Sequence, residues 1–138
     1  MTPVLIDTSV IVALIDQDAR LHARCAEFVL AQTAPLITCE AVIAESCHLL
    51  RRYHGGAEAV LENIEAGVFQ IPFRIESSAG RVLRIIRKYH DREVDLADAC
   101  LIDLANALGT GDILTLDRDF EIYRWGMNKH FRYLIDRT

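Results

Sequence analysis

The sequence lacks a long apolar run. A helix needs roughly 20 consecutive apolar residues to cross a bilayer, and no stretch of the 138 residues approaches that length. The longest apolar run near the start, Val10–Ile15, is only six residues long and lies between Asp7 and Asp16, which is too short for the core of a signal peptide. We therefore expect a soluble cytoplasmic protein with no membrane partner.

An excess of positive charge is also missing. The chain has 15 Lys and Arg residues against 20 Asp and Glu residues, which gives a formal net charge of −5. A protein held on nucleic acid mainly by bulk positive charge would be basic, so the composition argues against that class. It leaves open a nuclease whose own carboxylates bind cations.

Several enzyme motifs are absent as well. The four cysteines form no C-x-x-C pair and have no zinc-ribbon spacing, so we interpret them as small buried residues in a reducing compartment. The five histidines show no H-E-x-x-H spacing, and there is no G-x-S-x-G elbow and no P-loop. Zinc hydrolases, serine hydrolases and P-loop enzymes are therefore not indicated.

What the chain does contain is an alternation of short apolar runs and amphipathic stretches. Without a linker or repeat, this predicts a single α/β domain over residues 1–138, with helices on both faces of a parallel sheet. The expected strands are Val4–Ile6, Leu36–Thr38, Val68–Ile71, Ile113–Leu116 and Tyr133–Ile135. The expected helices are 21–31, 40–53, 57–66, 78–90 and 96–108, with a short helix at Phe120–Trp125. The expected helix boundaries are stops at Gly55–Gly56 and Gly109, a start at Ser77–Ser78 and a cap at Asp95.

Carboxylates follow two of the expected strands. Ligands of such sheets bind at the carboxyl ends of the strands; Asp7 follows the first strand, and Asp117 and Asp119 follow the fourth. The alternative for Asp7 is a helix cap, which Thr8 or Ser9 could supply equally well. The alternative for the later pair is a turn and a cap, for which Asp119 is better placed, whereas Asp117 is better placed for a site.

Two further acids lie on expected helices. In the helix 96–108, Asp98 falls at the edge of the apolar stripe, where a carboxylate is costly to bury unless a cation or donors meet it. Asp103 falls on the opposite side and is interpreted as an ordinary solvated residue. Glu45 lies on the flank of its helix stripe, so periodicity alone favours a surface glutamate.

A cluster of carboxylates without histidine or cysteine suits Mg²⁺ or Mn²⁺ and is poor for Zn²⁺. One or two such ions can lower the pKa of water and stabilise the charge on a phosphodiester. Without a cation, adjacent carboxylates raise one another's pKa. The acids therefore favour metal-assisted phosphodiester chemistry.

Four sequence blocks resemble the PIN-domain ribonucleases, and most closely the small VapC toxin type. The blocks are VLIDTSVIVAL at Val4–Leu14, AES at Ala44–Ser46, DLADA at Asp95–Ala99 and TLDRDF at Thr115–Phe120. The resemblance implies a three-layer α/β sandwich with a five-stranded parallel sheet. It also implies a Mg²⁺- or Mn²⁺-dependent endoribonuclease, the toxin of a toxin–antitoxin pair, in which water attacks phosphorus and leaves a 5′-phosphate and a 3′-hydroxyl.

The resemblance also assigns site residues. It implies that four carboxylates bind metal and act in catalysis, namely Asp7, Glu45, Asp98 and Asp117. Thr8 or Thr115 could hydrogen-bond a ligand carboxylate or water, and Asp119 competes with Asp117 for the fourth place. Glu45 is thus raised above what its helix position indicates.

Partners are less well defined by the sequence. Arg81, Arg84 and Lys88 share one face of the helix 78–90 and could bind RNA phosphates, although a solvated amphipathic helix is the alternative. A homodimer and a protein antitoxin are expected from the resemblance, with apolar helix faces near Leu21–Leu30 or Leu49–Tyr53 available for contact.

Two other functions share features with this sequence. A phosphoacceptor receiver domain also has an acidic Mg²⁺ pocket, but it needs a lysine near the end of its fifth strand, and neither Lys88 nor Lys129 fits that place. A non-catalytic module of the same fold that binds RNA or protein stays open.

Overall fold

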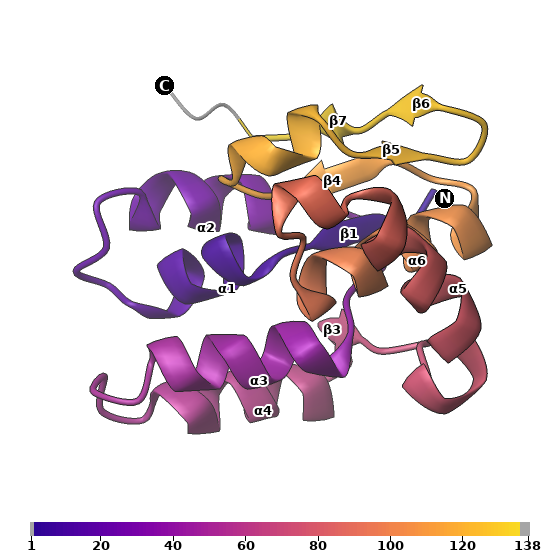
Figure 1. Ribbon diagram of the computed structural model, residues 1–138. Helices are drawn as coiled ribbons and strands as arrows, with labels where there is room; N and C mark the ends of the chain where they lie inside the picture. The colour runs from indigo at the N-terminus through magenta and orange to yellow at the C-terminus, as the bar shows by residue number, and fades with distance from the viewer. Residues whose placement is uncertain (1, 136–138) are drawn as a thin grey trace.

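The computed structural model describes residues 2–135, which form a central parallel sheet and its flanking helices (Figure 1). The sheet has five strands in the order β3-β2-β1-β4-β7, and all neighbours pair in parallel. The strands are β1 Val4–Ile6, β2 Leu36–Ile37, β3 Phe69–Gln70, β4 Asp112–Leu114 and β7 Arg132–Tyr133. The predicted five-stranded parallel sheet is therefore confirmed.

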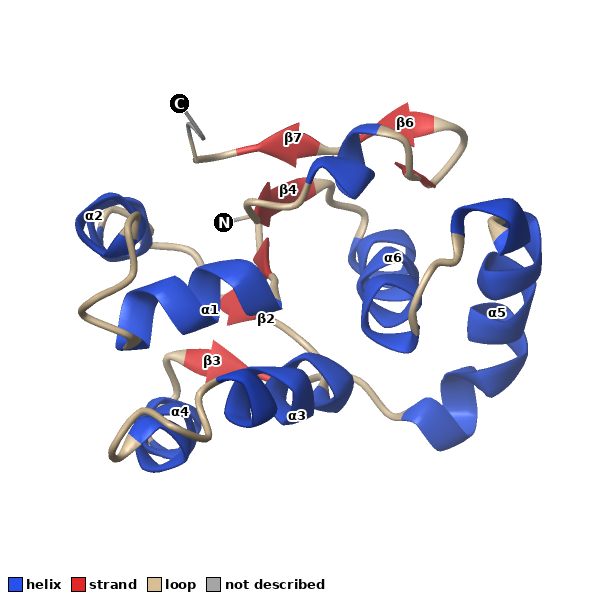
Figure 2. Ribbon diagram, turned by 60° about the vertical axis from the view of Figure 1, so that its left-hand side comes forward, coloured by secondary structure: helices blue, strands red, loops and turns tan. Residues whose placement is uncertain are grey.

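Helices cover both faces of this sheet, as predicted for a three-layer sandwich. They are α1 Thr8–Ile15, α2 His22–Leu30, α3 Glu40–Leu49, α4 Gly56–Glu65, α5 Ile75–Lys88 and α6 Leu96–Leu108, with 3₁₀ helices η1 His90–Arg92 and η2 Arg118–Glu121. Figure 2 shows α1 and α2 on one face and α5 and α6 on the other. The chain runs outward from β1 to β3 and then crosses back to β4, and right-handed crossovers put the two groups of helices on opposite faces.

The central strands are apolar because both of their faces are covered. Leu5 and Ile6 in β1 and Ile113 and Leu114 in β4 are completely buried. Helix α6 is buried along residues 97–105, since α5 packs on its outer side. Within residues 2–135, none of the helices combines the length and the apolar character that a membrane span requires.

Some predicted helix ends are wrong. Helix α5 begins at Ile75, three residues before the predicted start at residue 78, because Arg74 is the last extended residue. Helix α3 ends at Leu49, and Gly55, with a φ of 73°, precedes α4 instead of ending α3. The positive φ at Gly55 suits a residue without a Cβ. The predicted stop at Gly109 is confirmed, with a φ of 67°.

The predicted short helix at Phe120–Trp125 is also wrong. After η2, strand β5 (Arg124–Trp125) pairs antiparallel with β6 (Lys129–His130). The Trp125 indole lies so close to Gly111 that a Cβ added there would be 1.9 Å from its Nε1. The contact between Trp125 and Gly111 joins the hairpin to a segment before β4, and the local sequence pattern does not predict it.

Candidate metal centre

Asp7 is brought to the carboxyl edge of the sheet by strand pairing. Ile6 in β1 is in register with Leu114 in β4, and the Asp7 N–H donates to the Leu114 carbonyl at 3.0 Å. Asp7 is also the N-cap of α1, because its Oδ1 accepts from the Thr8 N–H at 2.8 Å. The cap and the site are thus compatible roles for the same carboxylate.

The end of β4 is tied to Asp7 through Thr115. The Thr115 hydroxyl donates to Asp7 Oδ2 at 2.7 Å, and its Oγ1 accepts from the Asp117 N–H at 3.0 Å. The Leu116 N–H donates to Ser9 Oγ at 2.9 Å, which joins the same segment to α1. The segment that carries Asp117 is therefore held beside Asp7 by hydrogen bonds through the hydroxyls of Thr115 and Ser9.

Asp98 enters from the other face of the sheet, in the first turn of α6. The Asp98 N–H donates to Oδ1 of Asp95 at 2.9 Å, so the predicted cap of this helix is confirmed. The Tyr123 hydroxyl donates to Asp98 Oδ2 at 3.2 Å. Sequence reasoning did not identify Tyr123 as a site residue, because the contact depends on how the segment after η2 folds back over α6.

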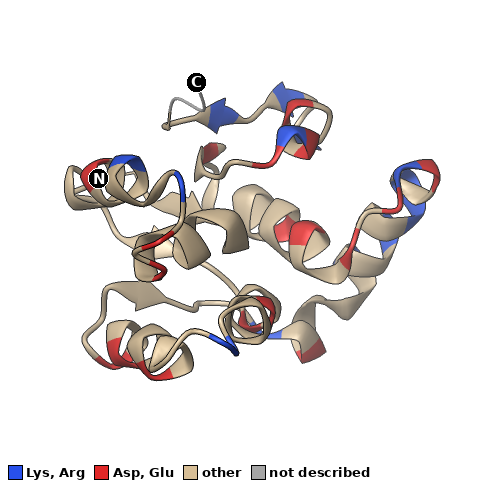
Figure 3. Cartoon of the chain, turned by 90° about the vertical axis from the view of Figure 1, so that its left-hand side faces the viewer, with Lys and Arg blue, Asp and Glu red and all other residues tan. Residues whose placement is uncertain are grey.

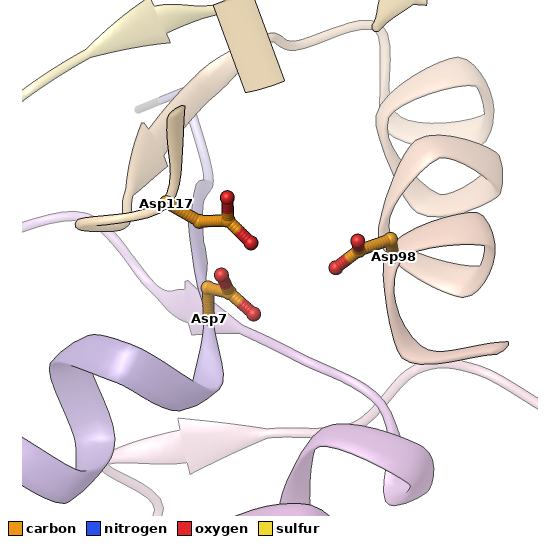
Figure 4. A group of neighbouring side chains, drawn as sticks. All are labelled: Asp7, Asp98 and Asp117. Carbon is orange, nitrogen blue, oxygen red and sulfur yellow. The ribbon is translucent and has the colours of Figure 1, made fainter. Parts of the chain in front are cut away.

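The three aspartates converge on one point (Figure 4). Asp7, Asp98 and Asp117 each offer a carboxylate oxygen, and these oxygens lie within 4.8 Å of one another. We call these three residues the acidic cluster. They come from the end of β1, from α6 and from the segment after β4.

Two other predicted acids lie outside the acidic cluster. Glu45 is exposed on α3, although its charge contributes to raising the pKa of Asp7. Asp119 is exposed, and its backbone N–H donates to Asp117 Oδ1 at 2.9 Å. Asp117 is therefore the cap of η2 as well as a member of the cluster, and the assignment of that cap to Asp119 is wrong.

Burial and mutual repulsion of the carboxylates raise the pKa values of two members of the acidic cluster. Burial, with smaller contributions from the charges of Asp117 and Glu45, raises the pKa of Asp7 to about 6, although bonds from Thr115 and Thr8 oppose this. Burial also raises the pKa of Asp98 to about 8, with further contributions from the surrounding carboxylates.

The donor set fits a hard divalent cation. It consists of carboxylate oxygens, which Mg²⁺ and Mn²⁺ prefer, and a cation would relieve the repulsion among them. Next to Asp7, the Thr8 hydroxyl is buried and has no hydrogen-bond partner among the described residues. The hydroxyl of Thr8 is therefore a buried polar group beside Asp7 that the described protein atoms leave unpaired.

The interpretation of Asp103 as a solvated residue is wrong. It is 2% exposed, and its Oδ1 accepts from Arg81 Nε at 2.9 Å. The helical wheel assumed one buried face, whereas α5 covers the outer side of α6. A signal was available in the sequence, because Cys100 and Ile102 place apolar side chains off the main stripe.

A family model described as "PIN domain" matches residues 4–126. The chain belongs to the PIN domain family. A curated relative of this PIN domain is Ribonuclease VapC26 of Mycobacterium tuberculosis (strain ATCC 25618 / H37Rv), with 33% identity over 116 residues, 83% of this chain and 86% of the relative.

The fold of this PIN domain is also found in a solved toxin structure. The crystal structure of Mycobacterium tuberculosis VapC20, described as a sarcin–ricin loop cleaving toxin, matches with a TM-score of 0.79. The match covers 86% of this chain and 93% of the other, with 21% sequence identity. At that identity the likeness extends to the fold alone.

Proposed function

We propose that this PIN domain is a divalent-metal-dependent endoribonuclease that hydrolyses phosphodiester bonds in RNA. The observation that carries the proposal is the acidic cluster, whose three oxygens lie within 4.8 Å at the carboxyl edge of the sheet. The relationship to Ribonuclease VapC26 supports RNA as the substrate class. A chain without a nucleophilic or zinc motif has no other evident catalytic set.

Asp7, Asp98 and Asp117 would hold Mg²⁺ or Mn²⁺, with Glu45 adding negative charge from α3. When bound, one or two such ions lower the pKa of water and stabilise charge on the phosphate. Thr115 and the Thr8 N–H donate to the two oxygens of Asp7, so this carboxylate is oriented before a ligand arrives.

We also propose that the chain acts as the toxin of a toxin–antitoxin pair and forms a homodimer. The relationship to Ribonuclease VapC26 supports the toxin role, and the homodimer is an expectation from the sequence resemblance. Leu30 on α2 and Leu49 on α3 are exposed apolar residues within the two surfaces predicted for contact. Size-exclusion chromatography at micromolar concentration is expected to show a dimer, and elution as a monomer contradicts that part of the proposal.

The proposal is tested by cleavage of single-stranded RNA with Mg²⁺, with Mn²⁺ or with EDTA. Cleavage is expected only with a divalent ion, and the products are expected to carry a 5′-phosphate and a 3′-hydroxyl. Asp7→Asn should lower the rate by at least about 100-fold, because it removes a ligand charge. Asp18→Asn, a change of an exposed carboxylate in the α1–α2 loop, serves as the matched control.

The alternative function makes a different prediction. A non-catalytic module of the same fold would bind RNA but leave it intact with every metal. Retained binding without cleavage would therefore replace the nuclease with an RNA-binding module.

A further inference from the structure

A groove with a strong positive bias lies between α5 and α6. It has a volume of about 670 Å³, with Arg81, Arg84 and Lys88 on the α5 side and Asp103 and Asn106 on the α6 side. Figure 3 shows Lys and Arg gathered along α5, the outer helix. Asp103 is the only acid among the described residues that line the groove, so its cations outnumber its acids even though the chain has a net charge of −5.

The first of these cations is held in a fixed orientation. Arg81 donates from Nε to Asp103 Oδ1 at 2.9 Å and from Nη2 to Ser78 Oγ at 3.1 Å. The carboxylate of Asp103 is buried, whereas the Arg81 side chain is half-exposed. A guanidinium has five N–H donors, so donors remain for a ligand after these bonds are made. Because the side chain is already ordered, binding an anion costs less conformational entropy.

The other two cations continue the same row. Arg84 and Lys88 follow Arg81 at helical spacing, and both are exposed. Like charges at this spacing repel each other, and a row of phosphates along the groove would relieve that repulsion. The arrangement favours an extended anion over a single small one.

Two buried tyrosines, Tyr89 and Tyr123, lie between the Lys88 end of the groove and the acidic cluster. The Lys88 ammonium lies 5.2 Å from the centre of the Tyr89 ring, and this ring is 5.1 Å from that of Tyr123. The Tyr123 hydroxyl donates to Asp98. The Lys88 end of the groove is therefore two aromatic rings away from the acidic cluster.

We propose that this groove binds the phosphodiester backbone of the RNA strand that is cut at the acidic cluster. The inference rests on the proposed function. Carboxylates repel phosphates, so an acidic chain that holds RNA at its acidic cluster needs cations close by. Contacts to the backbone carry no base information, so the groove positions the strand without selecting its sequence.

The test compares two double variants in RNA binding. Arg84→Ala/Lys88→Ala removes the two groove cations other than Arg81, and Arg20→Ala/Arg87→Ala removes the same charge from exposed positions that do not line the groove. Binding of fluorescein-labelled single-stranded RNA is followed by anisotropy in EDTA, over a series of salt concentrations. The groove variant should bind on the order of 10-fold more weakly, and its salt slope should fall by about 1.4 for two lost contacts. The control should stay within about two-fold of the unchanged protein.

Cleavage by the unchanged protein, measured in parallel with Mg²⁺ and Mn²⁺, separates the two proposals. If it cuts RNA and both double variants bind RNA equally, the groove proposal is overturned and the nuclease stands. If it cuts nothing but the groove variant alone loses RNA binding, the groove binds RNA and the proposed nuclease fails. Unchanged RNA binding together with lost binding of a polyglutamate peptide would assign the groove to a protein partner and overturn the proposal.

Discussion

Helix α6 carries two buried aspartates that are treated very differently. Asp98 is 8% exposed and Asp103 is 2% exposed, and burial of either carboxylate is costly by itself. Asp103 meets the guanidinium of Arg81. Asp98 accepts from the Tyr123 hydroxyl, which lowers its pKa. Burial, with the charges of nearby aspartates, outweighs that bond and raises the pKa of Asp98 to about 8. The chain thus compensates one charge internally and leaves the other to be compensated from outside, which is typical of a functional site.

The largest expected effect comes from neutralising each aspartate in turn. Asp98→Asn should lower RNA cleavage by at least about 100-fold, yet leave the metal-free protein as stable as before or more so, because it removes a repelled charge. Asp103→Asn should leave cleavage within a few-fold and lower the free energy of unfolding by about 1–2 kcal/mol, because the bond to a half-exposed Arg81 is weakened. Initial cleavage rates and urea denaturation in EDTA measure the two quantities. If both folded variants lose cleavage equally, the distinction between Asp98 as a site residue and Asp103 as a structural residue is wrong.

The pH dependence of stability sharpens the same contrast. Asp98 and Asp7, with pKa values of about 8 and about 6, keep protons in the folded chain that unfolded aspartates, with a pKa near 3.8, have already lost. Stability falls with rising pH wherever the folded state binds more protons. In EDTA, the free energy of unfolding should therefore fall between about pH 5 and 8, by on the order of 1–3 kcal/mol.

Magnesium and the two asparagine variants provide the controls for this pH dependence. Excess Mg²⁺ should offset the fall, because a cation favours the charged carboxylates. Asp98→Asn should flatten the upper part of the curve, whereas Asp103→Asn should keep it. Urea denaturation across this pH range, with EDTA or Mg²⁺, gives the profiles. A free energy of unfolding that rises with pH in EDTA would contradict the raised pKa values of Asp7 and Asp98.

Much of the fold was accessible from the sequence, because strands covered on both faces are apolar throughout. Val4–Ile6 illustrates this, since all three of its residues are buried. The hairpin after η2 was not accessible, because it depends on the fit of Trp125 over Gly111. Local pattern predicts an element when the element itself determines its burial, and fails when a distant segment does.

The aspartates of the acidic cluster could be predicted from the sequence, whereas the contacts that surround them could not. Asp7 and Asp117 follow paired parallel strands, so sequence order alone brings them to one edge of the sheet. Asp98 was identified because its place on the wheel is costly for a charge. The Tyr123 bond to Asp98 and the Arg81 bond to Asp103 join elements whose packing no periodicity specifies.

The smallest expected effect concerns the hydrogen bond that the Tyr123 hydroxyl donates to Asp98. Tyr123→Phe removes one oxygen while the ring keeps its edge-to-face contacts with Tyr89 and Phe120, at 5.1 and 5.2 Å. The hydrogen bond lowers the pKa of Asp98, so its loss should raise that pKa further and shift metal binding to higher pH. We expect Mg²⁺ affinity near neutral pH to fall by about 3–10-fold. The effect is modest because the hydrogen bond from Tyr123 to Asp98 is long, at 3.2 Å.

Tyr89→Phe is the matched control, because the hydroxyl of Tyr89 accepts from the Arg124 N–H and touches no carboxylate of the acidic cluster. Isothermal titration with Mg²⁺ at several pH values compares the two variants. If both shift the pH midpoint of binding equally, the Tyr123 hydroxyl has no specific effect on Asp98. If Tyr123→Phe alone shifts it, the hydroxyl tunes the charge of Asp98, because a loss of packing alone would lower stability without moving that midpoint.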